Sequence, residues 1–207
     1  MKLDFYEHNL PGKLITFEGL DGCGKTTMIQ RLSGQLTVDN GQVLITKQPT
    51  DEVRRSPIFR AFHDLPFAEA SKTYDYRAMA LMAAADRVQH VKAVILPALR
   101  EGKTVISDRY FYSCLANLRA RGLEQDEWVY EVVKQLPMPD VAVFLDVSVE
   151  VAVGRVRMRE SERERFVDVA FEERLRGEYL SFAGIHIDSS GGVDETWRVL
   201  VEELKLR

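Results

Sequence analysis

The chain has 207 residues, 45% of them hydrophobic, which suits one α/β domain with a core of ordinary size (residues 1–207). Its 28 basic and 32 acidic residues leave a net charge of −4, so no overall positive field favours nucleic acid or an anionic membrane as a partner. No segment approaches the ~18 apolar residues of a membrane span, and the N-terminal residues lack the apolar core of a signal peptide. We therefore expect a soluble, cytoplasmic protein.

The cysteine residues show no metal-binding or redox pattern. Cys23 and Cys114 lie far apart in the sequence, without a CxxC pair or a histidine spacing suited to zinc. We expect both to be free thiols in a reducing compartment.

The first strong pattern is an apolar strand, a glycine-rich turn and an amphipathic helix in succession. The strand is expected over residues 13–18, and the helix over residues 25–36, whose apolar residues recur at helical spacing. Between them, the run Gly19-Leu20-Asp21-Gly22-Cys23-Gly24-Lys25-Thr26 fits the phosphate-loop pattern G-x-x-x-x-G-K-[ST]. A chance glycine turn is the alternative, but the complete motif and both flanks favour phosphate binding.

This loop has the chemistry to hold a polyphosphate. Its glycines permit backbone conformations closed to other residues, so that successive N–H groups turn inward around an anion. Lys25 would reach the β- and γ-phosphates of a nucleotide, and the Thr26 hydroxyl would ligate Mg²⁺. The helix that begins there would point its positive end at the same anion.

Further elements follow the first helix in chain order. They are a turn at Asn40-Gly41, a strand over residues 42–47, a mobile segment with a short helix over 50–66, one or two long helices over 69–100 and a strand over 104–107. The mobile segment is placed to cover a ligand.

The second half of the chain continues the alternation of strands and helices. It predicts two helices between residues 111 and 135 that separate near Gly122, a strand over 141–145 near the centre of the sheet, a helix capped by Ser148 that carries Arg155, Arg157 and Arg159, a helix over 168–182, a strand over 185–187 and a helix over 194–206. Such alternation after a phosphate loop predicts an α/β fold of the P-loop NTPase type, with a five-stranded parallel sheet covered by helices on both faces.

Asp108-Arg109-Tyr110 directly follows the third strand. Ligands of open α/β sheets bind at the carboxyl ends of the strands. Asp108 is therefore a candidate for the Mg²⁺ site, and Arg109 is a candidate for binding a second phosphate. A structural ion pair at the strand end is the alternative.

An arginine-rich stretch follows the fourth strand. Arg155, Arg157, Arg159, Arg163 and Arg165 lie close together in an otherwise acidic chain. One interpretation is a solvated helix whose arginines pair with the intervening glutamates, and the other is a short mobile lid, over about residues 155–166, that clamps phosphate. The phosphate loop favours the lid, because phosphoryl transfer needs mobile cations that exclude water when the site closes.

Asp86-Arg87, within the long helix, is a third candidate. The two side chains either form a buried ion pair, or Arg87 reaches the acceptor nucleotide. His90, one turn later, is expected on the helix surface rather than in catalysis.

Together these motifs resemble the thymidylate kinase family, in its bacterial form with an arginine-rich lid. The resemblance covers nearly the whole chain and is carried by residues 17–27 (FEGLDGCGKTT), 84–90 (AADRVQH), 95–99 (ILPAL), 108–110 (DRY), 145–148 (LDVS) and the arginine stretch. It implies transfer of the γ-phosphoryl group of ATP, with Mg²⁺, to a nucleoside monophosphate, usually dTMP giving dTDP, by a homodimer. Glycine at position 22, together with the arginines of the lid, resembles the subtype whose lid supplies the catalytic cation.

The resemblance also implies residue roles. The catalytic residues would be Lys25, Asp21, Arg109, Arg159 and Arg163, with Arg159 or Arg163 as the transition-state clamp and the Asp21–Arg109 pair positioning the acceptor phosphate. The ATP-binding residues would be Gly19, Leu20, Asp21, Gly22, Cys23, Gly24, Lys25, Thr26, Thr27 and Arg155. The acceptor would contact Arg87, Arg109, Ala83, Asn117 and Arg60, with Arg54 and Arg55 as alternatives to Arg60. Mg²⁺ would be bound by Thr26 and Asp108.

The acceptor side departs from the family at several places, which include Leu118-Arg119 in place of the usual Gln-Gly, a longer segment over residues 50–56, and two positions that would adjoin the base. Ala83 stands where the family's phenylalanine stacks on thymine, and Asn117 stands where an aromatic residue adjoins the sugar and base. An enlarged pocket for a purine or a modified pyrimidine is therefore one competing hypothesis. A deoxynucleoside kinase with Glu18 as its general base is a second, and a nucleotide-binding regulator without activity is a third.

Overall fold

The computed structural model describes residues 3–38 and 42–206, so the turn expected at Asn40-Gly41 lies outside the described residues. Within them, five strands form one sheet in the order β2-β3-β1-β4-β5, and all neighbouring strands are parallel. The strands are β1 (Lys13–Glu18), β2 (Val43–Lys47), β3 (Thr104–Asp108), β4 (Val141–Asp146) and β5 (Ile185–Asp188). The predicted five-stranded parallel sheet is confirmed.

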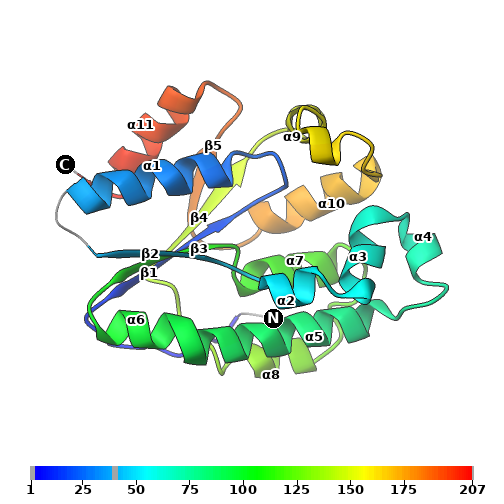
Figure 1. Ribbon diagram of the computed structural model, residues 1–207, viewed down its shortest axis with the longest axis horizontal. Helices are drawn as coiled ribbons and strands as arrows, with labels where there is room; N and C mark the ends of the chain where they lie inside the picture. Colours follow the sequence, from blue (N-terminus) through cyan, green and yellow to red (C-terminus); the bar gives the residue numbers. More distant parts are fainter. Residues whose placement is uncertain (1–2, 39–41, 207) are drawn as a thin grey trace.

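Helices cover both faces of this sheet (Figure 1). On one face lie α1 (Lys25–Val38) and α11 (Val193–Glu203), and on the other lie α5 (Tyr76–His90), α6 (Leu96–Arg100), α7 (Phe111–Arg119) and α8 (Trp128–Val133). The other helical segments are α2 (Asp51–Arg54), α3 (Pro57–Asp64), α4 (Phe67–Ala70), the π-helical turn η1 (Val91–Ile95), α9 (Val149–Arg157), the 3-10 turn η2 (Glu160–Glu162) and α10 (Val169–Leu180). No helix in the described part of the chain is long and apolar enough to cross a membrane.

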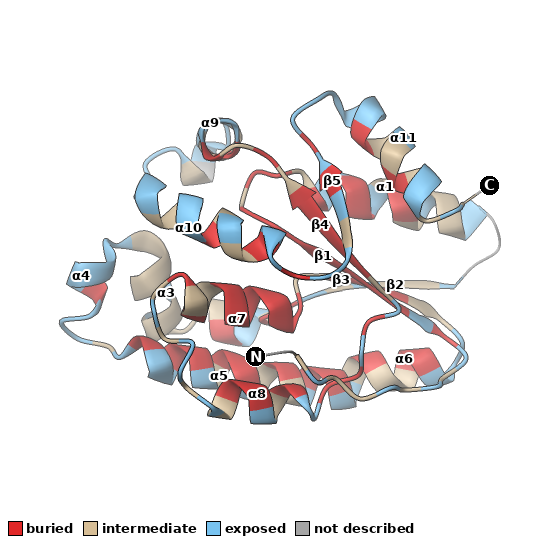
Figure 2. Ribbon diagram, turned by 180° about the vertical axis from the view of Figure 1, so that it is seen from behind, coloured by how far each residue is buried: buried red, intermediate tan, exposed pale blue. Residues whose placement is uncertain are grey.

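The middle of the sheet is the centre of the core. Figure 2 shows the inner strands as mostly buried, and β1 is buried at every position after Lys13. Continuous burial of this kind is typical of parallel strands with helices on both faces. β4, which we expected near the centre, lies one place from the middle, since β1 pairs with both β3 and β4.

The long helix begins later than its apolar pattern predicts. Asp75 caps α5 by accepting a hydrogen bond from the N–H of Arg77 (2.7 Å), so the helix starts at Tyr76, and α4 is a separate turn before it.

Near the other end of this helical region, Pro97 lacks an N–H group, and its ring would crowd the carbonyl group four residues earlier. The wider turn of η1 precedes this proline and accommodates it.

The arginine-rich stretch is less helical than predicted. Ser148 caps α9 as expected, by accepting a hydrogen bond from the N–H of Val151 (3.4 Å), but α9 ends at Arg157. The placement of Arg159 on this helix is therefore wrong, because its backbone is extended ahead of η2. Met158, which directly follows α9, is 76% exposed, so the arginine-rich residues after α9 add no buried apolar side chain that would stabilise a longer helix.

Candidate active site

The phosphate loop connects β1 to α1 at the carboxyl end of the sheet. Gly19 and Gly22 have φ angles of +130° and +90°, which residues with side chains rarely adopt. Both also pack against backbone, since a Cβ atom on Gly19 would lie 2.3 Å from the carbonyl oxygen of Leu145, and one on Gly22 would lie 2.3 Å from that of Ala152. β4 and α9 therefore hold the loop in one curve, which leads into the N-terminus of α1, where an anion is favoured.

The ammonium group of Lys25 lies inside this curve. Its Nζ donates hydrogen bonds to the carbonyl oxygens of Gly19 (3.1 Å) and Leu20 (2.8 Å), and the residue is only 6% exposed. Thr26 and Thr27 follow on the exposed first turn of α1. A cation and two hydroxyl groups thus lie together at the start of the helix, the arrangement that binds phosphate in such loops.

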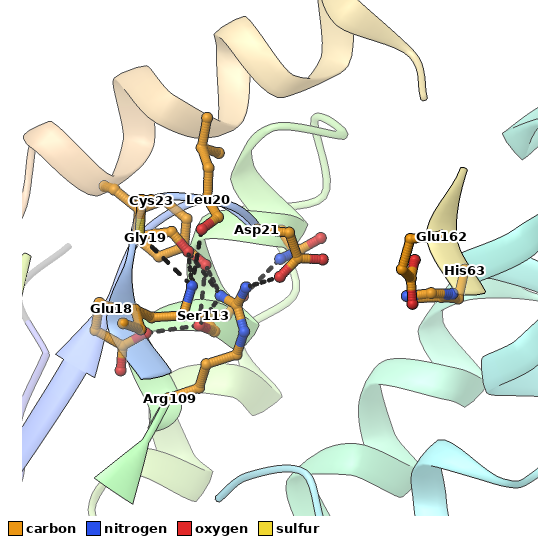
Figure 3. A network of polar contacts seen from close by, with 12 residues as sticks. Glu18, Gly19, Leu20, Asp21, Cys23, His63, Arg109, Ser113 and Glu162 are labelled. Carbon is orange, nitrogen blue, oxygen red and sulfur yellow. Dashed lines mark hydrogen bonds and ion pairs between the residues drawn. The ribbon is translucent and has the colours of Figure 1, made fainter. Parts of the chain in front are cut away.

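Arg109 joins the end of β3 to the phosphate loop. Its Nη2 donates to Oδ1 of Asp21 (2.5 Å), and its Nη1 donates to the carbonyl oxygen of Gly19 (2.9 Å), to Oγ of Ser113 (3.1 Å) and to the hydroxyl of Tyr179 (2.8 Å). Figure 3 shows this network beside the carbonyl groups of the loop. The backbone of Arg109 has a φ of +68°, a strained conformation for a residue other than glycine. The fold therefore fixes one guanidinium against the loop.

The environment of Asp21 keeps its side chain charged. Burial raises the pKa of this carboxyl, but the charges of Arg109, Lys25 and Arg165 outweigh that effect and hold its pKa well below the usual value. An anionic Asp21 orients the surrounding cations at the mouth of the loop.

Glu18 is a second carboxylate near this network, but it is fully buried. Burial raises its pKa to about 7, although a hydrogen bond from Ser113 and the charge of Arg109 lower it in part. Its oxygens accept hydrogen bonds from the N–H of Tyr110 and the hydroxyl of Ser113, both at 2.6 Å. Glu18 does not line the cavity described next, so its position does not favour the role of general base for a sugar hydroxyl.

A cavity of about 610 Å³ lies beside the Asp21–Arg109 pair, a volume within the range of small-molecule sites. Its walls come from α3, α5, α7 and α10 and from the residues that precede α10. Four predicted acceptor-binding residues line it, namely Arg87, Arg109, Ala83 and Asn117.

Arg87 is a wall residue rather than half of an ion pair with Asp86. It is 2% exposed, and its Nη1 and Nε donate to the carbonyl oxygens of Ala83 (2.9 Å) and Tyr110 (3.3 Å). Asp86 accepts hydrogen bonds from the N–H (2.8 Å) and the hydroxyl (2.5 Å) of Thr50 instead. The Asp86–Arg87 bridge is therefore not part of the described structure.

The remaining acceptor candidate, Arg60, lies away from the cavity. It forms an exposed ion pair with Asp64 (2.8 Å) on α3. Arg54 lines the cavity in its place, held by hydrogen bonds to the carbonyl oxygens of Pro49 (2.8 Å) and Gln48 (3.4 Å). The sequence alone did not distinguish these arginines, because the packing of α2 and α3 decides which one turns inward.

Among the lid arginines, Arg165 contacts the phosphate loop. Its Nη1 donates to Oδ2 of Asp21 (3.1 Å) and lies 3.1 Å from Nε2 of His63 and 3.2 Å from Glu162. Arg155 also reaches the loop, through the carbonyl oxygen of Gly22 (3.4 Å). Arg157, Arg159 and Arg163 are exposed. Sequence reasoning missed the position of Arg165, since spacing does not show which arginine of a non-helical segment points inward.

The residues suggested for Mg²⁺ offer suitable donors. In the described residues, no group of three or more His, Cys, Asp or Glu side chains is arranged to hold a metal ion. Asp108, at the end of β3, has a buried Oδ1 without a hydrogen-bond partner in the described structure. An orphaned carboxylate oxygen and the exposed Thr26 hydroxyl fit a hard cation that takes its other ligands from phosphate and water.

Comparison with known proteins agrees with this geometry. A family model described as thymidylate kinase matches residues 17–190. A probable thymidylate kinase of Pyrococcus horikoshii is 42% identical over 172 residues, which cover 83% of each chain. A thymidylate kinase of Cereibacter sphaeroides is 34% identical over 199 residues, covering 89% of this chain and 90% of that protein, and one of Lactobacillus acidophilus is 29% identical over 211 residues, covering 96% of each. The chain belongs to the thymidylate kinase family.

Proposed function

We propose that this protein transfers the γ-phosphoryl group of ATP to a nucleoside monophosphate and that its acceptor is dTMP, which becomes dTDP. One arrangement carries the proposal: the Asp21–Arg109 pair joins the phosphate loop to the neighbouring cavity. The loop has the chemistry to hold the donor, and the cavity has the size to hold the acceptor. The names of the relatives support dTMP as the acceptor.

The donor phosphates would lie in the curve of residues 19–27. Lys25 would exchange its carbonyl partners for phosphate oxygens, and Arg155, which bonds the carbonyl oxygens of Gly22 and Ser189 (3.0 Å), would support the outer side of the nucleotide. Thr26 and Asp108 would hold Mg²⁺, which neutralises the phosphate charge and polarises the transferred group when bound.

The acceptor would place its phosphate against Arg109 and Arg54 and its base toward Arg87, Ala83 and Asn117. The fixed guanidinium of Arg109 would hold the attacking oxygen in line with the donor, which lowers the barrier through positioning. A phosphate monoester is already largely deprotonated near neutral pH, so the reaction needs no strong general base. The burial of Glu18 is consistent with that mechanism.

The lid would close over the transferred phosphoryl group. Arg165 already lies against Asp21 with 12% of its side chain exposed, so we assign it the part of transition-state cation. Arg159 and Arg163, the candidates favoured by sequence, would approach the donor only after the exposed segment moves.

The assembly and location are also proposals. We expect a homodimer, on the family resemblance, and a cytoplasmic enzyme, since Cys23 and Cys114 are free thiols. Light scattering coupled to gel filtration tests the first, because a monomer at micromolar concentration contradicts it.

Coupled ADP release with Mg-ATP tests the proposed reaction. The acceptors are dTMP, dUMP, dCMP, dAMP and dGMP, their ribose counterparts and thymidine. We expect the highest kcat/KM with dTMP. Turnover of thymidine alone would indicate a deoxynucleoside kinase, a preference for another monophosphate would change the acceptor, and binding of ATP without turnover of any acceptor would indicate a regulator.

A further inference from the structure

One face of α5 carries two small side chains, Ala80 and Ala83, where the acceptor base would lie. Tyr76, Ala80, Ala83 and Arg87 follow one another at intervals of three and four residues, so they share a face of the helix, and all four line the cavity. The ring that the family places at Ala83 is absent. On this face a ring is supplied by Tyr76, seven residues earlier and about 10 Å along the helix axis.

The guanidinium of Arg121 fills the space beside that ring. Its Cζ atom lies 4.1 Å from the ring centroid of Tyr76 and 3.9 Å from that of Phe171, near the start of α10. A third ring, that of Phe67, lies 5.3 Å away. At the two shorter distances a guanidinium contacts the π-face of each ring directly, and this attraction is stronger where water is excluded.

Hydrogen bonds fix the same guanidinium to α7. Nη1 of Arg121 donates to the carbonyl oxygen (3.2 Å) and to Oδ1 (3.0 Å) of Asn117. The amide group of Asn117 in turn donates to the carbonyl oxygen of Ser113 (2.9 Å). The residue that replaces the family's aromatic side chain at position 117 is therefore the one that orients Arg121.

Arg109 and Arg121 lie at opposite ends of α7, because Arg109 precedes this helix and Arg121 follows it. Ser113, which accepts a hydrogen bond from Arg109, lies in the first turn of α7, whereas Arg121 follows the end of that helix at Arg119. Arg109 and Arg121 both line the cavity. A nucleotide whose phosphate meets Arg109 would direct its base toward Arg121.

We infer that Arg121 is a specificity-determining residue of the acceptor site. Its guanidinium, which lies against the rings of Tyr76 and Phe171, forms the wall of the base pocket that aromatic side chains at positions 83 and 117 would form in the family. The inference rests on the proposed nucleoside monophosphate kinase activity. The wall fills space that a purine would need, and the edge of the guanidinium not used by Asn117 offers donors to a carbonyl oxygen of thymine.

Packing alone is a poor reason for an arginine at this position. Its Nε is buried without a hydrogen-bond partner in the described structure. A buried donor left unsatisfied is costly, and an apolar side chain of similar volume would fill the same space without that cost. The contacts with the rings of Tyr76 and Phe171 also favour a cation at this position, and recognition of the acceptor would add a use for the donors that Asn117 leaves over.

The test compares the wild-type protein with Arg121→Ala, Arg121→Lys and the matched control Arg119→Ala. Arg119 is the last residue of α7 and also lies over a ring, with its Cζ 5.2 Å from the centroid of Phe182, but it does not line the cavity. Coupled ADP release gives kcat and KM for dTMP, dUMP, dGMP and dAMP and the KM for ATP. Titration calorimetry measures binding of the same monophosphates, and circular dichroism and thermal melting check folding.

For Arg121→Ala we expect the KM for dTMP to rise about tenfold and the preference for dTMP over dGMP to fall at least about tenfold, with the KM for ATP unchanged. Arg121→Lys keeps the charge but loses the planar contact with the rings, so it should shift the preference in the same direction by a smaller factor. Arg119→Ala should keep the wild-type preference.

If the folded Arg121 variants keep the wild-type preference, the inference is wrong while the proposed function stands. If the wild type turns over no monophosphate, the proposed function fails, and calorimetry still compares the binding preference of the variants. A wild-type protein that binds none of the four monophosphates overturns both. If Arg121→Ala does not fold, Arg121→Lys decides the outcome.

Discussion

At the scale of single residues, Lys25 would carry the charge on which the proposed binding of the donor depends. Its ammonium group lies within the loop and is almost fully buried, so no neighbouring lysine can replace it. We expect Lys25→Ala to lower kcat by a factor of about 10² or more, since it removes a fixed cation from developing phosphate charge. Coupled ADP release measures the loss, with the exposed Lys92→Ala as the control. Near-normal turnover of Lys25→Ala would refute the phosphate-loop assignment.

The lid arginines allow a second test. Because Arg165 contacts Asp21, Arg165→Ala should lower kcat by about 10² while changing the KM for ATP little, the pattern of an interaction made in the transition state. Arg159→Ala and Arg163→Ala test the assignment that the sequence favoured, and exposed Arg157→Ala is the control. If Arg159→Ala or Arg163→Ala loses more kcat than Arg165→Ala, that arginine, and not Arg165, is the transition-state cation.

The buried Glu18 predicts a specific dependence of stability on pH. Burial raises its pKa from 4.5 to about 7, so between these values the folded protein holds a proton that the unfolded chain releases. The free energy of unfolding should therefore fall as pH rises through this window. Glu18→Gln cannot titrate there, so urea unfolding at about pH 5 and about pH 7.5 should show a smaller fall than in the wild type. Equal falls in both proteins would contradict the raised pKa.

At the scale of elements, the contact between the phosphate loop and α9 shapes the proposed donor site. A Cβ atom on Gly22 would lie 2.3 Å from the carbonyl oxygen of Ala152, and the φ of +90° adds strain to any side chain there. We expect Gly22→Ala to destabilise the protein by roughly 2–4 kcal/mol and to lower kcat/KM for ATP. Gly154, on the same α9, has open space around it.

Gly154→Ala is the matched control for this contact. It should stabilise the protein by about 0.5–1 kcal/mol, because alanine favours the helix and meets no neighbour. Urea unfolding measures both variants. Equal stability of Gly22→Ala and the wild type would show that the loop can move away from α9 at little cost.

At the scale of the whole molecule, the Asp21–Arg109 pair joins the phosphate loop and the cavity, the proposed donor and acceptor sites. A bisubstrate ligand, with adenosine and thymidine joined through a chain of phosphates, should therefore bind both at once and gain from effective concentration. We expect it to raise the melting temperature more than ATP and dTMP together at equal concentration. If the bisubstrate ligand raises the melting temperature no more than the mixture does, the two nucleotides bind too far apart for direct transfer.

Much of the architecture followed from local patterns. The strands 13–18 and 104–107, the first helix and the separation near Gly122 are confirmed to within a few residues, because apolar periodicity and glycine act over short stretches of chain. The late start of α5 at Tyr76 was missed, because a single hydrogen bond, donated by the N–H of Arg77 to the side chain of Asp75, starts the helix inside a continuous apolar pattern. The early end of α9 was missed, because exposure of Met158 depends on tertiary packing.

The sequence by itself determined the parallel α/β fold and the phosphate loop, since the glycines, Lys25 and Thr26 act within eight consecutive residues. Only the tertiary structure decided which arginines surround the cavity. Arg54, Arg121 and Arg165 face it while Arg60 turns away, and spacing along the chain does not reveal this because helices distant in sequence form the walls. Arg121 is the clearest case: the two rings nearest to its guanidinium lie on α5 and α10, and its hydrogen-bond partner lies on α7.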